Sequence, residues 1–364
     1  MSTTAGLAAY GFTPAMHAVL EARGMIFEIP ARVTAVHKER YALICDRGEC
    51  YGRLKSAVYY NGGAQEFPTT GDFVLIQFNE LGDSVITETL PRKSLFARKN
   101  PTLGEGDQVV AANFDSVFIM QSLNHDLNPK RLERYLALSW QSGAMPVVVL
   151  TKSDLVDSYA EQMNEILRVA AGVDVFAVSA KTGYGFDALR DYLKPGKTIV
   201  LLGSSGVGKS SFVNALAGEM LMAVNEIRED DSKGRHTTTH RQLIRMNNGV
   251  MIIDTPGMRE LGMLDAAAGL SETFSDVEQY FPLCRFSDCS HGREPGCAVQ
   301  AAIASGELPL SRYESYQKLQ RESQYAASQT NYLKLKQQRF TEIAKMSKAL
   351  QKSGGKRGTY GRDE

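Results

Sequence analysis

The stretch from Gly203 to Ser210 has the residue types and the spacing of a phosphate-binding loop. It reads GSSGVGKS and matches G-x-x-x-x-G-K-[ST] at every defined position, between an apolar run at 198–202 and a helical pattern. Glycines let successive backbone N–H groups face a phosphate, Lys209 can reach the β- and γ-phosphates, and the Ser210 hydroxyl can ligate Mg²⁺. The residues predicted to contact the phosphates are Gly203, Ser204, Ser205, Gly206, Val207, Gly208, Lys209, Ser210 and Ser211.

Two loops earlier in the chain carry residues that can select the base. Thr151-Lys152-Ser153-Asp154 follows the apolar run 145–150 and fits [NT]-K-x-D. The Asp154 carboxylate can accept hydrogen bonds from the N1–H and the exocyclic amine of guanine, a donor pair that adenine lacks. Ser179-Ala180-Lys181 follows the run 173–178, and its Ala180 N–H can meet the guanine O6. Either loop alone could be an ordinary surface loop, but beside a full phosphate loop they predict a guanine nucleotide, GTP or GDP.

The order of these motifs is unusual. Both base-selecting loops come before the phosphate loop, whereas ordinary small GTPases place them after it. Such a rotation preserves the sheet if the former termini are joined and new ones open in a loop. The join is predicted at 194–197, in the sequence KPGK. We therefore expect an α/β P-loop domain with a circularly permuted order of strands.

Two segments after the phosphate loop have residues suited to Mg²⁺ and to catalysis. Asp254 ends an apolar run in the sequence DTPG, so we expect it to support Mg²⁺ and the Gly257 N–H to meet the γ-phosphate. A threonine of 237–239 can complete the Mg²⁺ shell, and the residues leave open which one. Met258 stands where small GTPases often have a glutamine that orients water. Slow intrinsic hydrolysis is therefore expected, completed by a partner or by His236, whose alternative role is packing or capping.

A group of cysteines near the end of the chain has metal-ligand spacing. Cys284, Cys289, His291 and Cys297 form C-x4-C-x-H-x5-C, and three cysteines with one histidine are a common structural zinc set. Buried free thiols with a surface histidine are the alternative interpretation. Cys45 and Cys50 have no histidine near them and are interpreted as ordinary reduced residues.

The chain of 364 residues is long enough for several domains. We expect an N-terminal extension at 1–29, a β-barrel at 30–98, the α/β domain at 99–268, a zinc-binding helical domain at 269–352 and a disordered basic tail at 353–364. Short alternating runs between 30 and 98 fit an OB-fold, although an SH3-like barrel or a small sandwich would have a similar pattern. The five runs are ARVTAV (31–36), YALICD (41–46), CYGRLK (50–55), DFVLIQF (72–78) and SVITETL (84–90). The helix after the run 116–120 is predicted at 129–143.

Charge and hydropathy restrict the possible partners and the cellular location of the protein. Lys+Arg and Asp+Glu balance at 41 each, but the chain becomes basic after residue 317, which suits either a polyanionic partner or a solvated helix face. No apolar run reaches the roughly 18 residues that span a bilayer, and no signal-peptide pattern begins the chain. We expect a cytoplasmic monomer.

The combination of GSSGVGKSS, GRHTTTHR, DTPGMRELG, TKSD, SAKTGYG and the cysteine spacing resembles the ribosome small-subunit-dependent GTPases, the RsgA (YjeQ) family of bacteria. The resemblance covers most of the chain, and the N-terminal stretch and the tail depart from it. It implies an OB-fold, a permuted GTPase domain and a zinc domain. It also implies late maturation of the 30S subunit, contact with its 16S rRNA and GTP hydrolysis stimulated by the subunit. Thr238 would be the Mg²⁺ threonine and His236 the catalytic histidine.

Two other functions fit the same motifs. The first is a nucleotide-gated RNA-binding scaffold in which hydrolysis is incidental. The second is a GTPase for a non-ribosomal RNA or protein partner.

Overall fold

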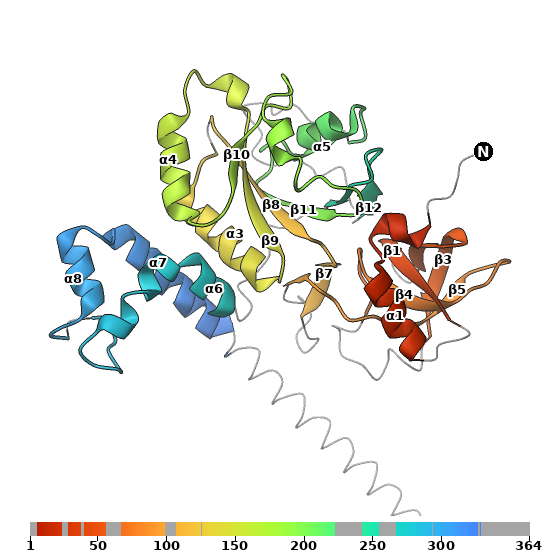
Figure 1. Ribbon diagram of the computed structural model, residues 1–364, viewed down its shortest axis with the longest axis horizontal. Coiled ribbons are helices and arrows are strands. Elements are labelled where there is room, and N and C mark those ends of the chain that lie inside the picture. Colours follow the sequence, from red (N-terminus) through yellow and green to blue (C-terminus); the bar gives the residue numbers. More distant parts are fainter. Residues whose placement is uncertain are drawn as a thin grey trace, which may run out of the picture.

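The computed structural model describes residues 6–23, 28–37, 40–55, 67–98, 107–124, 126–222, 242–254, 267–292, 294–326 and 328 (Figure 1). Three parts follow one another along the chain: a barrel, an α/β sheet domain and a helical part with a cysteine cluster. In the described part of the chain, no helix is both long enough and apolar enough to cross a membrane.

The first part is a closed five-stranded barrel. Its strands pair in the order β1-β2-β3-β5-β4, and β4 pairs back with β1. The β3–β5 pair is parallel and the other pairs are antiparallel. Closure into a Greek-key barrel confirms the predicted OB-fold and not the sandwich. The strands are β1 (Ile29–His37), β2 (Arg40–Cys45), β3 (Gly48–Leu54), β4 (Phe73–Gln77) and β5 (Ser84–Thr89).

The segment before the barrel packs on its outer side. It contains the 3-10 helix η1 (Leu7–Tyr10) and the helix α1 (Pro14–Ala22). The Thr13 side chain caps the start of α1 by accepting a hydrogen bond from the Met16 N–H. Apolar residues of this segment form a small core with Phe73 and Leu75 of β4. Val74 and Ile76 alternate with them and face the barrel core. Strand β4 is therefore apolar on both sides because both sides are covered.

The second part is a mostly parallel sheet with helices on both faces (Figure 1). Its strands are ordered β10-β9-β8-β11-β13-β12, and β12 alone in this order runs antiparallel to its neighbour. Every residue of β8 is buried, because α3 and α4 cover one face and α5 covers the other. The strands are β8 (Ser116–Ser122), β9 (Met145–Thr151), β10 (Val175–Ala177), β11 (Thr198–Leu202), β12 (Gln242–Arg245) and β13 (Met251–Asp254). The helices are α3 (Pro129–Gln141), α4 (Ala160–Val169) and α5 (Lys209–Ala217).

The path of the chain through this sheet confirms the permutation. The chain enters at β8, moves outward to β9 and β10, and then returns to place β11 on the other side of β8. The connection from β10 back to β11 contains the 3-10 helix η4 (Phe186–Leu189) and the predicted join at 194–197. Strand β11, which leads into the phosphate loop, therefore lies in the middle of this sheet although it is the fourth strand of the sheet domain along the chain.

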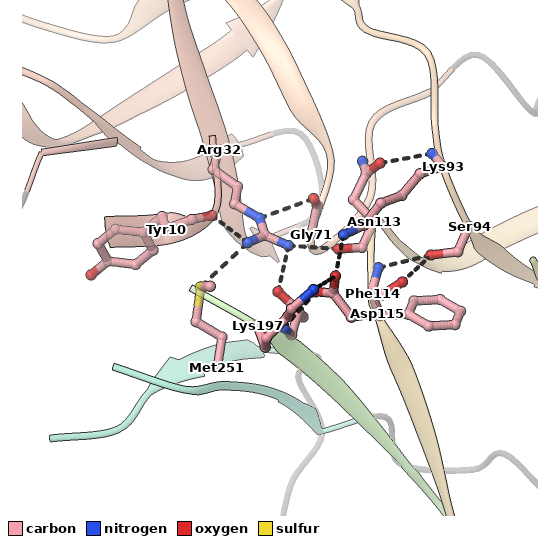
Figure 2. A network of polar contacts seen from close by, with 11 residues as sticks. Tyr10, Arg32, Gly71, Lys93, Ser94, Asn113, Phe114, Asp115, Lys197 and Met251 are labelled. Carbon is pink, nitrogen blue, oxygen red and sulfur yellow. Dashed lines mark hydrogen bonds and ion pairs between the residues drawn. The ribbon is translucent and has the colours of Figure 1, made fainter. Parts of the chain in front are cut away.

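A buried arginine joins the barrel to the sheet domain (Figure 2). Arg32 of β1 is 1% exposed and donates to the Gly71, Tyr10 and Asn113 carbonyls, at 3.2 Å for Gly71 and 2.9 Å for Asn113. It also donates to the Thr198 hydroxyl at 3.0 Å. Burial lowers its pKa to about 10, so it remains a cation at neutral pH.

Two further features complete this connection. Asp115 accepts hydrogen bonds from Lys93, Lys197 and the Thr198 N–H at 2.8, 3.1 and 2.9 Å. Strand β1 also pairs with β12 through Ala35 and Gln242, so barrel and sheet are hydrogen-bonded into one layer. Between the two parts, β6 (Leu95–Arg98) and β7 (Gln108–Ala112) form a small antiparallel pair.

The third part is helical and packs on α3. It contains α6 (Ala267–Thr273), α7 (Ser275–Glu278), the 3-10 helix η6 (Phe281–Leu283), α8 (Ala298–Ser305) and a helical stretch at 310–326. Arg312 is buried and bonds Glu133 of α3 at 2.8 Å, and Asp276 at 3.0 Å. Gly269 allows α6 to approach α3, since a Cβ there would lie 2.0 Å from the Ala137 carbonyl oxygen.

Candidate nucleotide site and metal centre

The predicted phosphate loop leaves the carboxyl end of β11 and leads into α5. Its shape depends on glycine: Gly206 and Gly208 have φ of 74° and 102°, and a Cβ on Gly203 would lie 2.7 Å from the Met120 carbonyl oxygen. Val207 points into the core and is fully buried, while Ser205 and Gly206 are exposed. The loop is therefore anchored by one apolar residue and presents its backbone to solvent beside the α5 N-terminus.

The Lys209 ammonium lies against the loop. It donates to the Gly203 carbonyl at 2.9 Å and to the Ser204 carbonyl at 2.6 Å. Ser210 and Ser211 follow it in the first turn of α5 and are half-buried. The cation, the loop N–H groups and the Ser210 hydroxyl thus come together at one end of the sheet, where they can bind a phosphate chain.

The first base-selecting loop is hydrogen-bonded to the phosphate loop. Thr151 ends β9 and is buried, and its hydroxyl donates to the Val207 carbonyl at 2.6 Å, with the Gln121 carbonyl oxygen at 3.2 Å as a second, weaker acceptor of the same proton. A buried hydroxyl with these partners supports the loop. Lys152 follows with φ of 58°, and Ser153 and Asp154 begin the 3-10 helix η3 (Ser153–Leu155).

The second base-selecting loop is hydrogen-bonded to the first. The buried Ser179 donates to the Asp154 carboxylate at 2.7 Å and also accepts from the Thr182 N–H at 3.2 Å. Ala180 is half-buried and Lys181 is exposed in the same loop. The Tyr159 and Tyr184 hydroxyls are 2.8 Å apart and connect the two loops again. The sequence analysis did not identify this tyrosine pair, because no short motif contains it.

Several predicted site residues are not in the described structure. His236, Thr238 and Gly257 lie outside the described residues. Asp254 is described only as the last backbone position of β13, paired with Gln242. The structure thus brings together the phosphate loop and both base-selecting loops, and the Mg²⁺ and catalytic predictions for the other segments remain predictions.

The cysteine cluster has the geometry of a four-ligand metal centre. The ligand atoms of Cys284, Cys289, His291 and Cys297 all lie within 4.8 Å of one another. The Cys284 Sγ is 3.4 Å from the His291 Nδ1 and 4.0 Å from the Cys297 Sγ. Tetrahedral Zn²⁺ with bonds of about 2.3 Å requires ligand separations of about 3.8 Å, which these distances fit.

The surroundings favour the metal-binding forms of Cys284 and His291, whereas burial raises the pKa of Cys289 to about 11. Burial opposes ionisation of Cys284, but hydrogen bonds from the Ala298 and Val299 N–H groups and contacts with the other thiols outweigh it and lower its pKa. Burial lowers the pKa of His291 and favours its neutral form. Its ring stacks on Phe281 with 4.2 Å between centroids. Four protein donors leave no position for substrate, so the set suits a structural ion.

Comparisons with known proteins agree with this arrangement. A family model described as RsgA GTPase matches residues 89–264. A model described as ABC transporter matches residues 186–353, a stretch that includes the phosphate loop that both classes of nucleotide-binding protein share.

Relatives of similar length are more informative. "Small ribosomal subunit biogenesis GTPase RsgA 1" of Listeria innocua is 50% identical over 85% of this chain and 87% of its own length. "Small ribosomal subunit biogenesis GTPase RsgA" of Methanosarcina acetivorans is 43% identical over 79% of each chain.

Solved structures match the fold as well. The crystal structure of YjeQ from Thermotoga maritima has a TM-score of 0.61 and 28% identity, over 81% of this chain and 98% of that one. YloQ, described as a circularly permuted GTPase, has a TM-score of 0.59 at 24% identity, over 82% of this chain and 95% of that one. The identity of 50% and 43% to the Listeria and Methanosarcina proteins, over 87% and 79% of their length, shows that the chain belongs to the RsgA family of GTPases.

Proposed function

We propose that this protein binds GTP, hydrolyses it to GDP and phosphate, and acts in late maturation of the small (30S) ribosomal subunit. The main support for nucleotide binding is the hydrogen bond from the Thr151 hydroxyl to the Val207 carbonyl, because it joins a base-selecting loop to the phosphate loop. The bond between Ser179 and Asp154 supports guanine as the base, since it directs the carboxylate that would accept from N1–H and the amine.

Each part of the nucleotide has residues of this chain assigned to it. The loop N–H groups and Lys209 would bind the phosphates, and Lys152 would lie over the base beside Ala180. Ser210, Thr238 and Asp254 would hold Mg²⁺, which supplies neutralisation of the phosphate charge. The Gly257 N–H would approach the γ-phosphate.

Hydrolysis requires a group that orients water. Met258 cannot do so by hydrogen bonding, so we assign this role to His236, completed on the ribosomal partner. Replacing His236 by Ala is expected to abolish stimulated turnover and to leave GTP binding intact. Unchanged stimulated turnover would remove His236 from this role.

The partner is inferred from the relatives' names and from one surface of the barrel. Arg40 lies over the Tyr51 ring at 3.8 Å, and Arg40 and Arg53 both bond Asp83, at 2.8 and 2.6 Å. These residues lie on β2, on β3 and beside the loop between β4 and β5, where OB-folds bind oligonucleotides. Exposed guanidinium groups and an aromatic ring suit phosphates and bases, so we propose 16S rRNA as the contact.

The cysteine cluster is proposed to hold one structural Zn²⁺. Its donors fit a tetrahedral ion. The ion would fix the segment 281–305, which begins with η6 and ends with α8. We also propose that the protein is a monomer and that it works in the cytoplasm.

The deciding experiment is GTP turnover at fixed protein concentration with purified 30S subunits, with 50S subunits and with neither. Strong stimulation by 30S subunits alone is expected. Equal turnover in all three reactions would overturn the ribosomal assignment, and absence of any GTP binding would overturn the nucleotide assignment. Retained 30S binding without turnover in any reaction would favour a scaffold.

A further inference from the structure

Asp126 lies outside every recognised motif and contacts the phosphate loop. It belongs to the loop between β8 and α3, and its Oδ2 accepts a hydrogen bond from the Ser204 hydroxyl. Ser204 is the second residue of the phosphate loop, and its carbonyl is one of the two that hold Lys209. A single residue of the phosphate loop is therefore held from one side by a carboxylate and from the other by the lysine that would bind phosphate.

The carboxylate is paired with an arginine of the next helix. The Arg131 Nη2 lies 2.8 Å from the Asp126 Oδ1, and the same guanidinium donates to the Asp126 carbonyl. Both side chains are partly buried, at 28% and 30% exposure. Arg131 is in the first turn of α3, where the Asn128 side chain accepts from its N–H at 3.0 Å. The helix start thus fixes the backbone of Arg131, and the guanidinium makes its contacts with Asp126.

Asn128, at the end of this loop, is also held in place. The buried Gln121 side chain accepts from the Asn128 N–H at 2.9 Å and donates to the Asn128 carbonyl at 3.2 Å. The Gln121 carbonyl accepts from Thr151, which also bonds Val207 of the phosphate loop. Asp126 therefore contacts the phosphate loop from a rigid support.

A carboxylate at this place presents an electrostatic problem. A negative charge next to a loop that binds a triphosphate repels the ligand, and the repulsion grows with the number of phosphates. Arg131 places a positive charge within one ion-pair distance of Asp126, so the pair is neutral while Asp126 still accepts from Ser204.

We propose that Asp126 is a positioning residue for nucleotide binding, which fixes the phosphate loop through Ser204, with Arg131 as its required counter-charge. The inference rests on the proposed function, because it requires a guanine nucleotide in this loop.

The test compares dissociation constants for GMP, GDP and GTP by titration calorimetry in the wild type, Arg131→Ala and Asp126→Ala/Arg131→Ala. Arg131→Ala leaves Asp126 uncompensated, so GTP binding should weaken on the order of five- to tenfold, GDP less and GMP least. The loss should shrink as NaCl rises from about 0.05 to about 0.5 M. The double variant has no net charge there but lacks the bond from Ser204 to Asp126, so its GTP affinity should fall only by the about two- to fivefold of one lost hydrogen bond, at low and high salt alike.

Ser204→Ala provides a contrasting variant. It removes a hydrogen bond but no charge, so binding should weaken by about two- to fivefold at low and high salt alike. Arg190→Ala is the matched control, because Arg190 pairs with Asp187 at 3.2 Å on the exposed surface, and its nucleotide affinities should equal those of the wild type.

Each result has a distinct meaning. Arg131→Ala affinities equal to those of the wild type would overturn the inference, and so would a loss in the double variant that depends on salt as strongly as the loss in Arg131→Ala. A wild type that binds no guanine nucleotide would overturn the proposed function and the inference together. Melting temperatures establish that each variant folds, and Arg131→Gln replaces Arg131→Ala if the shorter side chain prevents folding.

Discussion

The guanidinium of Arg32 in the barrel donates a 3.0 Å hydrogen bond to the hydroxyl of Thr198, the first residue of the strand that ends at the phosphate loop. The contact lies at the amino end of β11, whereas the nucleotide loops lie at the carboxyl ends of the strands. This hydrogen bond from the barrel and the phosphate loop therefore lie at opposite ends of β11.

Replacing Arg32 by Met should destabilise the protein by about 3 kcal/mol, because the buried carbonyls of Tyr10, Gly71 and Asn113 lose their donor. Urea unfolding followed by the fluorescence of Trp140, the one tryptophan of the chain, measures the change. Arg23→Met is the control, since Arg23 pairs with Glu88 at 2.9 Å on the surface and should have little effect. Equal midpoints for the two variants would show that the buried network contributes nothing.

Replacing Thr151 by Val should weaken GDP binding by about fivefold, because the isosteric side chain cannot donate to the Val207 carbonyl. Thr151→Ser keeps the hydroxyl and should retain most of the affinity. Calorimetric titration with GDP distinguishes the two. If Val and Ser variants bind alike, the hydroxyl does not hold the phosphate loop.

The hydrogen bonds to Asp115 should make stability depend on acid pH. Burial opposes its ionisation, but hydrogen bonds from Lys93, from the Thr198 N–H and from Lys197 outweigh this and hold its pKa below the ordinary 3.8. The folded state therefore binds this proton less readily than the unfolded state. The resulting stability is complete above pH 3.8 and is lost as the pH falls through the lower folded value.

Asp115→Asn tests this dependence. It should cost about 1–2 kcal/mol at pH 7 and flatten the loss of stability as the pH falls below 3.8. Urea unfolding at several pH values provides the measurement. An acid profile as steep as that of the wild type would exclude Asp115 as its source.

Removing zinc should unfold the cysteine cluster without preventing nucleotide binding. Cys289→Ser, or a strong chelator, is expected to reduce the zinc content from one ion per chain and to speed hydrogen exchange in 281–305. GDP affinity should be retained, because the cluster shares no residue with the nucleotide loops. Cys50→Ser is the control, since this barrel cysteine is not part of the cluster. Full zinc content in Cys289→Ser would mean that Cys289 is not a ligand.

Local patterns predicted the elements that position the site. The helix expected at 129–143 is α3 at Pro129–Gln141, and the five runs of the barrel coincide with β1 to β5 to within two residues. The phosphate loop, the base-selecting loops and the candidate zinc ligands could be predicted because each needs fixed residue types at short spacing. The strand expected at 173–178 is shorter, at Val175–Ala177.

Long-range partners could not be predicted in this way. In the run ARVTAV, alternation places Arg32 on the polar side, yet it is buried because the sheet domain covers that side. Its partners Thr198 and Met251 are 166 and 219 residues away. Asp126 likewise meets Ser204 only after the permuted strands are assembled.

Pairing of β1 with β12 also protects the sheet from aggregation. A β12 strand without a neighbour would expose unpaired N–H and C=O groups on which another chain could add a strand. The barrel occupies that side, and the opposite outermost strand, β10, is only three residues long. A sheet domain separated from its barrel would therefore be expected to self-associate, so the barrel would contribute to solubility in addition to its proposed contact with RNA.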